Sequence, residues 1–106
     1  MAESFALTEA VYYILLSLIE PMHGYGIMQN VTELSNGRVN LAAGTLYGAI
    51  TTLLDRDWIV ALPEERNSRK KEYKITPGGR AAVESELVRL HELIGNGERI
   101  LGGGRI

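Results

Sequence analysis

The strongest chemical signal in the sequence is a cluster of basic residues in the second half of the chain. The whole protein of 106 residues has a net charge of -2, and residues 1–37 contain four Glu and no Lys or Arg. Residues 66–80, by contrast, contain six basic residues and one acidic residue, a net charge of +5. A local field of this kind attracts phosphate groups although the protein is acidic, but by itself it is equally compatible with a solvated hairpin. The six basic residues are Arg66, Arg69, Lys70, Lys71, Lys74 and Arg80.

A second signal is a predicted helix over residues 43–56 with an unusual outward face. Its inward face is marked by Leu46, Ile50, Leu53 and Leu54, which recur at helical spacing. A helix that is only solvated would carry Glu and Lys on the other side, because these residues favour helix and keep a surface soluble. Here the outward positions are small or hydroxylic, which allows another surface to approach closely. They are Gly44, Thr45, Tyr47, Gly48, Thr51 and Thr52.

Other chemistries find little support in the sequence. The chain has no Cys, which excludes a disulfide framework, a thiolate zinc site and a cysteine nucleophile. His23 and His91 are far apart and have no carboxylate at metal-ligand spacing, so we expect no metal. The run 24–26 lacks the third glycine of a dinucleotide-binding motif, and its glycines are interpreted as packing residues at a helix start. We expect no cofactor and no enzyme activity, because the remaining carboxylates are scattered.

The elements that position these residues follow from caps, breaks and periodicity. Thr8 is a good N-cap for a first helix that reaches about Ile19, and Asn36-Gly37 provides a left-handed stop for a second helix. Thr76 as N-cap with Pro77 at the first helical position opens a last helix. Two short extended runs, 58–62 and 72–75, form a hairpin whose basic tip is the cluster described above.

This order of elements predicts a mainly α fold with a small β-hairpin: a winged helix-turn-helix with an added C-terminal dimerisation helix. We expect the winged helix-turn-helix over residues 5–76, the dimerisation helix over 77–101 and a frayed tail over 102–106. In this fold the helix 43–56 enters the major groove of double-stranded DNA and the hairpin, or wing, contacts phosphates. The predicted contacts are Ala43, Gly44, Thr45, Tyr47, Gly48 and Thr51 on the helix, and Arg66, Ser68, Arg69, Lys70 and Lys71 on the wing.

Apolar residues at both ends of the chain exceed what one small core requires. Residues 10–19 are apolar except Ser17, and the last helix carries a heptad-like seam from Val83 to Leu101. Gly95 and Gly97 each cost a helix about 1 kcal/mol relative to Ala, so we expect helix beyond Ile94 only with a partner. We therefore predict a homodimer. Its predicted interface is Val11, Ile14, Leu15, Leu18, Val83, Leu87, Leu90 and Ile94.

The apolar run that ends at Ile19 is too short to cross a bilayer, and the N-terminus lacks the basic start of a secretory signal. We expect a cytoplasmic protein without a membrane partner.

Several short motifs also resemble the PadR family of bacterial transcriptional regulators. Their order and spacing are similar to the family's from about Leu7 to Ile94. The single C-terminal helix is similar to the family's small subgroup. The motifs are His23-Gly24-Tyr25-Gly26, Ser35-Asn36-Gly37, Gly44-Thr45-Leu46-Tyr47, the run 53–59, Arg69-Lys70-Lys71-Glu72-Tyr73, and Ile75-Thr76 with Gly79.

The resemblance implies a homodimeric repressor that binds an operator and is released by a small aromatic effector. It also implies that the first and last helices form the dimer interface. Two positions depart from the family: Gly48, where Arg or another polar residue is frequent, and Ala42, where a capping residue is usual. Operator sequence therefore cannot be carried over. The alternative function is a winged helix that holds another protein and does not bind DNA.

The expected effector pocket lies where the first and last helices meet. Tyr12, Tyr13 and Leu16 on one helix would face Leu87, Leu90 and His91 on the other, giving an apolar lining with a few polar groups. A fully packed interface without a cavity is the alternative.

Overall fold

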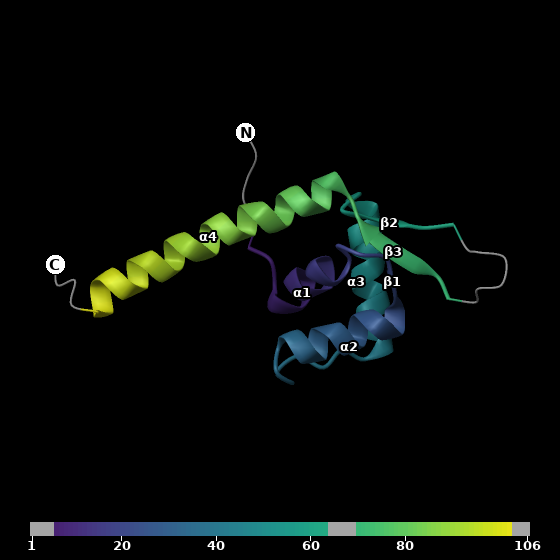
Figure 1. Cartoon of the computed structure of the whole chain (residues 1–106), viewed down its shortest axis with the longest axis horizontal. Helices are drawn as coiled ribbons and strands as arrows, with labels where there is room; N and C mark the ends of the chain where they lie inside the picture. The colour runs from purple at the N-terminus through teal and green to yellow at the C-terminus, as the bar shows by residue number, and fades with distance from the viewer. Residues whose placement is uncertain (1–5, 64–69, 103–106) are drawn as a thin grey trace.

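The structure is a computed structural model that describes residues 6–63 and 70–102. A small body contains three helices and a sheet, and a long fourth helix projects from it (Figure 1). In these ranges no helix is both long and apolar enough to span a bilayer. The predicted fold class is confirmed. The elements are α1 (Glu9–Ser17), β1 (Met22–His23), α2 (Gly24–Leu34), α3 (Ala43–Asp55), β2 (Ile59–Ala61), β3 (Glu72–Ile75) and α4 (Pro77–Leu101).

Local capping explains the start of α1 and both ends of α2. The Thr8 hydroxyl accepts a hydrogen bond from the Val11 N–H at 3.1 Å and starts α1, as predicted. Nδ1 of His23 does the same for α2, accepting from the Gly26 N–H at 3.1 Å. At the other end of α2, Asn36 and Gly37 have φ values of 55° and 80°, which confirms the left-handed stop. α3 begins after Ala42 without any side-chain cap.

The predicted hairpin is one part of a three-stranded antiparallel sheet with the order β1-β3-β2. Ile59 pairs with Ile75 across the hairpin, and Met22 pairs with Tyr73 on the other side of β3. β1 was not predicted, because a two-residue strand is too short to show the alternation that identifies strands. It ties the start of α2 to the strand that leads out of the wing.

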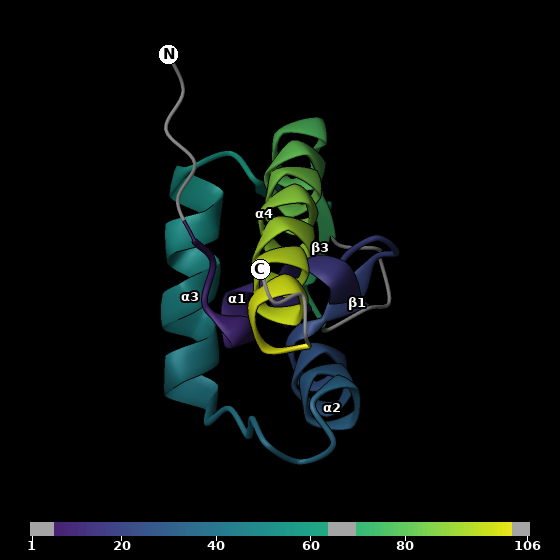
Figure 2. The same cartoon turned by 90° about the vertical axis from the view of Figure 1, so that its left-hand side faces the viewer.

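The core lies between α1, α2 and α3. Six of its side chains have no exposed surface: Ile14, Leu15, Leu18, Ile27, Val31 and Leu46. Figure 2 shows α3 on the left and α2 at the lower right, with α1 between them behind α4. The expectation that α1 carries a large surplus apolar face is therefore corrected, because α2, α3 and α4 of the same chain cover most of it.

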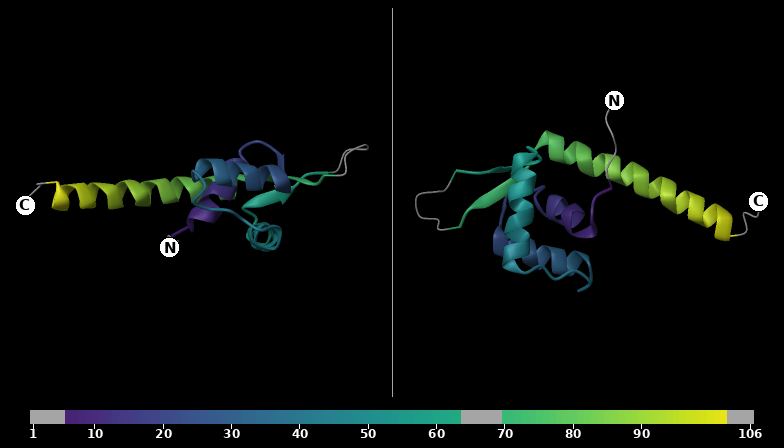
Figure 3. Two further views of the ribbon diagram at one scale, coloured as in Figure 1. Left: turned by 90° about the horizontal axis from the view of Figure 1, so that it is seen from below. Right: turned by 180° about the vertical axis from the view of Figure 1, so that it is seen from behind.

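α4 packs on the body only along its first half. Val83 and Glu86 are buried, whereas every residue from His91 to Gly102 is exposed, and Figure 3 shows this half extending away from the other elements. The helix reaches Leu101 in a single chain, although we expected it to need a partner beyond Ile94. Extension from an established helix adds one hydrogen bond for each residue fixed, which offsets the cost of the glycines.

Gly79 is required where α4 meets the sheet. A Cβ atom at this position would lie 2.8 Å from Cγ1 of Ile75 and 2.9 Å from the backbone carbon of Trp58, and would collide with the Trp58 carbonyl oxygen. We expect Gly79→Ala to lower the free energy of unfolding by about 3 kcal/mol, as overpacking against backbone does. Gly95→Ala is the matched control, because a Cβ there meets nothing and should stabilise α4 by up to about 1 kcal/mol. Equal urea midpoints for both variants would contradict this packing.

Glu86 links α4 to the segment before α1. Its side chain is 3% exposed and accepts hydrogen bonds from Nε and Nη2 of Arg89 at 2.9 and 2.6 Å. Arg89, and to a smaller extent the backbone N–H of Leu7, lower the pKa of Glu86 below its ordinary value of 4.5, although burial acts in the opposite direction. A depressed carboxyl pKa contributes stability above pH 4.5 that is lost as the pH falls through the folded-state value.

Glu86→Gln tests this link. At pH 7 we expect the free energy of unfolding to fall by about 1 to 3 kcal/mol, the usual loss for a hydrogen bond to a charged group. As the pH falls below 4.5, wild type and variant should converge, because the wild-type carboxylate becomes protonated too. Urea titrations at fixed protein concentration measure the free energy of unfolding of wild type and variant at each pH. A difference between the two that stays constant down to pH 3 would contradict the role given to the Glu86 carboxylate.

Candidate nucleic-acid interface

The six residues predicted on the recognition helix are all exposed in α3. A Cβ atom added at Gly44 or Gly48 would meet no other atom within 4 Å. The backbone of α3 is therefore open to close approach from outside along this face. We call the set Ala43, Gly44, Thr45, Tyr47, Gly48 and Thr51 the recognition face.

The two threonines of the recognition face offer different chemistry. The Thr51 hydroxyl donates to the carbonyl of Tyr47 at 3.0 Å, so its hydrogen is used within the helix. Its oxygen can still accept a hydrogen bond and its methyl group remains available. Thr45 has no hydrogen-bond partner among the described residues, so its hydroxyl can donate. Since phosphate oxygens only accept hydrogen bonds, Thr45 suits a phosphate or a base and Thr51 suits a base edge.

The basic cluster divides into two parts in the structure. Lys74 donates to the carbonyl of Ile19 at 2.8 Å, and Arg80 pairs with Glu84 at 3.5 Å, so both serve the fold. Lys70 and Lys71 are exposed and lie immediately before β3, the strand that leaves the wing. The remaining predicted wing residues lie outside the described residues: Arg66, Ser68 and Arg69.

Tyr47 brings the recognition face and the wing together. It is 47% exposed and borders a hollow of about 350 Å³, here called the wing hollow. Its other lining residues come from the junction of β1 and α2 and from the wing. They are His23, Gly24, Tyr25, Lys70 and Lys71. The hollow therefore collects two ammonium groups and two phenols at the N-terminal end of α2, where the helix dipole also favours an anion.

Gly24 leaves the space that Tyr47 occupies. A Cβ atom on Gly24 would lie 2.8 Å from Cζ of Tyr47 and would collide with its hydroxyl oxygen. The interpretation of this glycine as a packing residue at the start of α2 is confirmed. Its partner was not predictable from spacing, because Tyr47 lies on the next helix. Burial and, to a smaller extent, the neighbouring Tyr47 raise the pKa of Tyr73.

The predicted dimer residues separate into buried and exposed groups. Ile14, Leu15, Leu18 and Val83 are at most 6% exposed and belong to the chain's own core, so their prediction as interface residues is corrected. Leu87 and Ile94 are 40% and 55% exposed on α4. Val11 and Leu90 are half-buried. The exposed apolar surface among the predicted residues therefore lies mainly on α4, and α1 contributes only the half-buried Val11.

The residues predicted to bind an effector are partly covered. Tyr12, Tyr13 and Leu16 are half-buried, and His91 is exposed on the projecting half of α4. The rings of Tyr12 and Tyr13 lie 5.9 Å apart in a tilted arrangement.

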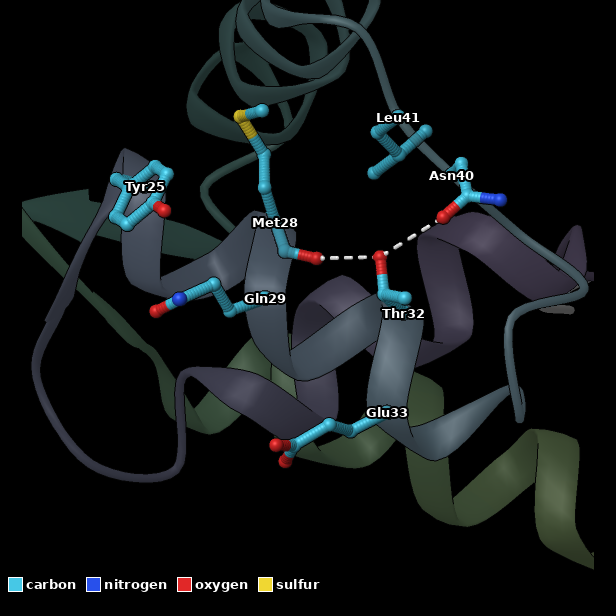
Figure 4. A pocket seen from close by; sticks show the side chains of 7 residues that line it. All are labelled: Tyr25, Met28, Gln29, Thr32, Glu33, Asn40 and Leu41. Atoms are coloured by element: carbon cyan, nitrogen blue, oxygen red, sulfur yellow. Dashed lines mark hydrogen bonds between the residues drawn. The ribbon is translucent and has the colours of Figure 1, made fainter.

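A hollow of about 390 Å³ lies elsewhere, on the outer side of α2 (Figure 4). There the Thr32 hydroxyl lies 3.1 Å from the carbonyl of Met28 and 3.2 Å from Oδ1 of Asn40, so the connector to α3 is held against α2. None of the residues that line it was a predicted site residue. They are Tyr25, Met28, Gln29, Thr32, Glu33, Asn40 and Leu41.

Comparison with known proteins gives a consistent picture. Residues 14–85 match the PadR-like family of transcriptional regulators. A protein of 37.1 kDa in a transposon of Streptomyces fradiae is 32% identical over 88 residues, which are 82% of this chain but 24% of that protein. The chain thus spans about a quarter of the length of this curated relative.

Solved structures share the fold. A transcriptional regulator from Clostridium thermocellum has a TM-score of 0.73 and 24% identity, with 87% of this chain and 89% of the other covered. Bacillus subtilis PadR in complex with operator DNA has a TM-score of 0.61 and 22% identity over 74% and 46% of the chains. Bordetella bronchiseptica BpsR, whose DNA binding is regulated by 6-hydroxynicotinic acid, has a TM-score of 0.64 and 24% identity over 93% and 69%.

Proposed function

Because the chain belongs to the PadR-like family of transcriptional regulators, we propose that it is a sequence-specific DNA-binding regulator that acts as a homodimeric repressor. The observation that supports this most is the junction at Tyr47. There, an exposed helix face whose side chains are small apart from Tyr47 adjoins the lysines of the wing. One surface can then read base edges while its neighbour neutralises phosphates.

Each part of this surface has a proposed role. α3 lies in the major groove, where Gly44 and Gly48 allow its backbone to approach the DNA closely. Thr51 accepts from a base amino group or places its methyl group on thymine, and Thr45 donates to a base or phosphate. Tyr47, Lys70 and Lys71 hold a phosphate at the wing hollow, which fixes the angle between α3 and the wing.

The dimer in this proposal forms mainly through α4. Its projecting half exposes Leu93 by 51%, Ile94 by 55% and Leu101 by 88%, which is costly for a helix surrounded by water. A two-fold arrangement places two recognition faces on half-sites about 34 Å apart. A small aromatic effector at the junction of α1 and α4 would release DNA if it binds the DNA-incompetent arrangement more tightly. The half-buried pair Tyr12 and Tyr13 and the effector-regulated neighbour support this part.

Selection of binding sites from random DNA tests the function. We expect a defined sequence that the protein prefers over a scrambled duplex by about 10³-fold or more, with affinity falling steeply between about 50 and 200 mM salt. Fluorescence anisotropy measures both quantities. Equal, salt-insensitive affinity for both duplexes would contradict the proposal and favour a protein-binding winged helix.

Gly24→Ala tests the role of Tyr47. The added methyl group displaces the phenol, so we expect affinity for any duplex to fall about tenfold, the value of one hydrogen bond to a charged group. Tyr47→Phe should produce a similar loss, because it removes only the hydroxyl. Gly95→Ala makes the same chemical change on α4 and should leave DNA affinity unaltered. Wild-type affinity in Gly24→Ala would show that Tyr47 does not contact DNA.

A further inference from the structure

The sequence contains two Asn-Gly pairs, Asn36-Gly37 and Asn96-Gly97. In such a pair the backbone nitrogen of the glycine can attack Cγ of the asparagine side chain, because glycine has no Cβ atom that obstructs the approach. The two pairs have the same composition but lie in different local structures. The fold therefore decides which of them reacts.

Asn96-Gly97 lies inside α4 (Pro77–Leu101). In an α-helix each backbone N–H is bound to the carbonyl four residues earlier, so the nitrogen of Gly97 is engaged. Oδ1 of Asn96 also accepts a hydrogen bond from Nη2 of Arg99 at 2.9 Å. Both reacting groups are held, and ring closure would require the surrounding turn of the helix to open.

Asn36-Gly37 forms the left-handed stop after α2. Asn36 has a φ of 55°, a conformation that is strained for a residue with a side chain. Its side chain is exposed and has no hydrogen-bond partner among the described residues. The nitrogen of Gly37 makes one hydrogen bond, to the carbonyl of Thr32 at 2.8 Å, and becomes available when this bond opens. Helix ends open locally at little cost in free energy, so this pair is the more reactive one.

We propose that Asn36 is a modification site at which the folded protein deamidates spontaneously, whereas Asn96 is protected. The nitrogen of Gly37 forms a bond to Cγ of Asn36 and gives its proton to the solvent. The Cγ–Nδ2 bond breaks, and the side-chain nitrogen takes a proton from water and leaves as ammonia. Water then opens the five-membered succinimide. Addition of water at Cγ gives an aspartate, and addition at the backbone carbonyl carbon gives an isoaspartyl linkage.

The isoaspartyl linkage changes the segment 35–42, which connects α2 to α3. Nδ2 of Asn40 donates to the carbonyl of Gly37 at 3.0 Å, and α3 begins after Ala42 without a side-chain cap, so this segment helps to fix the start of α3. The linkage inserts a methylene group into the main chain before Gly37 and moves the carbonyl that holds Asn40. The recognition face is then displaced. This effect on DNA binding rests on the proposed function, whereas the modification does not.

Mass spectrometry after trypsin digestion measures both sites in one sample, because cleavage after Arg38, Arg89 and Arg99 places them on different peptides. The full chain is kept folded in mildly alkaline buffer, and a parallel sample is kept in concentrated urea. In the folded protein we expect Asn36 to convert about tenfold or more faster than Asn96, because helix ends open more readily than helix interiors. In urea the two rates should be equal. Equal rates in the folded protein, or an intact Asn36 there when the urea sample has largely converted, would overturn the proposal.

Affinity for the preferred duplex measures the consequence. The isoaspartyl fraction, separated by ion exchange, should bind about tenfold more weakly than fresh protein, the value of one lost base contact. Asn36→Asp adds the same charge without lengthening the main chain and should bind like wild type. Asn36→Gly keeps the left-handed stop, cannot deamidate at this position and should keep its affinity after the same incubation.

Equal affinity of the isoaspartyl fraction and fresh protein would overturn the displacement of α3. Fresh wild type that fails to bind DNA would instead contradict the proposed function, and the mass spectra would still decide whether Asn36 is the modification site.

Discussion

Ile94→Glu is expected to convert the protein into a monomer that binds DNA about 100-fold more weakly than wild type. The substitution places a charge in the α4 seam, where Ile94 is 55% exposed in the single chain and therefore available to a partner. The loss is large because two linked half-sites bind with an avidity that exceeds single-site affinity by about 10² or more. Sedimentation velocity gives the assembly state and anisotropy gives the DNA affinity.

Val88→Glu is the control for this variant. Val88 is 69% exposed on the same helix, but its spacing from Leu87, Leu90 and Ile94 places it off the seam. It should remain dimeric and bind DNA like wild type. A wild-type protein that sediments as a monomer at micromolar concentration would contradict the dimer, whatever the two variants do.

The double variant Lys70→Ala with Lys71→Ala is expected to weaken binding to all duplexes alike. Each phosphate contact that is lost should reduce the slope of log K against log salt by about 0.9, so the pair should reduce it by up to about 1.8. Both lysines line the wing hollow beside Tyr47, which is why we assign them to the DNA backbone.

Arg80→Gln serves as the matched control for the lysines. Its guanidinium already pairs with Glu84 at 3.5 Å on α4, so its removal should leave the salt slope unchanged. A slope that is unaltered in the lysine variant would remove these two residues from the interface. If the lysine variant lost affinity only for the preferred sequence, the two lysines would instead contact bases.

Local rules predicted much of the fold. The caps Thr8 and Thr76 and the stop at Asn36-Gly37 act within one helical turn, so the ends of the helices follow from adjacent residues. The exposed side of α3 was predictable for the same reason, because periodicity alone identifies its apolar face. β1 was not predicted, because two residues are too few to show the alternation of apolar and polar side chains that identifies a strand.

The relations that were not predictable join residues far apart in the chain. Spacing could not show that Lys74 donates to Ile19, and thus that part of the basic cluster serves the fold. Apolar content could not show whether Ile14 and Leu15 face a partner or the chain's own core, since both locations remove the same surface from water. Nor could it show that the guanidinium of Arg56 lies over the ring of Trp58.

Hydroxyl-radical footprinting on a selected site shows where the protein lies along the duplex and therefore tests whether a dimer reads DNA with α3. We expect two protected regions about one helical turn, or 34 Å, apart, related by the two-fold symmetry of the site. Replacing the base pairs within them should abolish protection. A single protected region, or protection that does not depend on sequence, would contradict a dimer that reads DNA with α3.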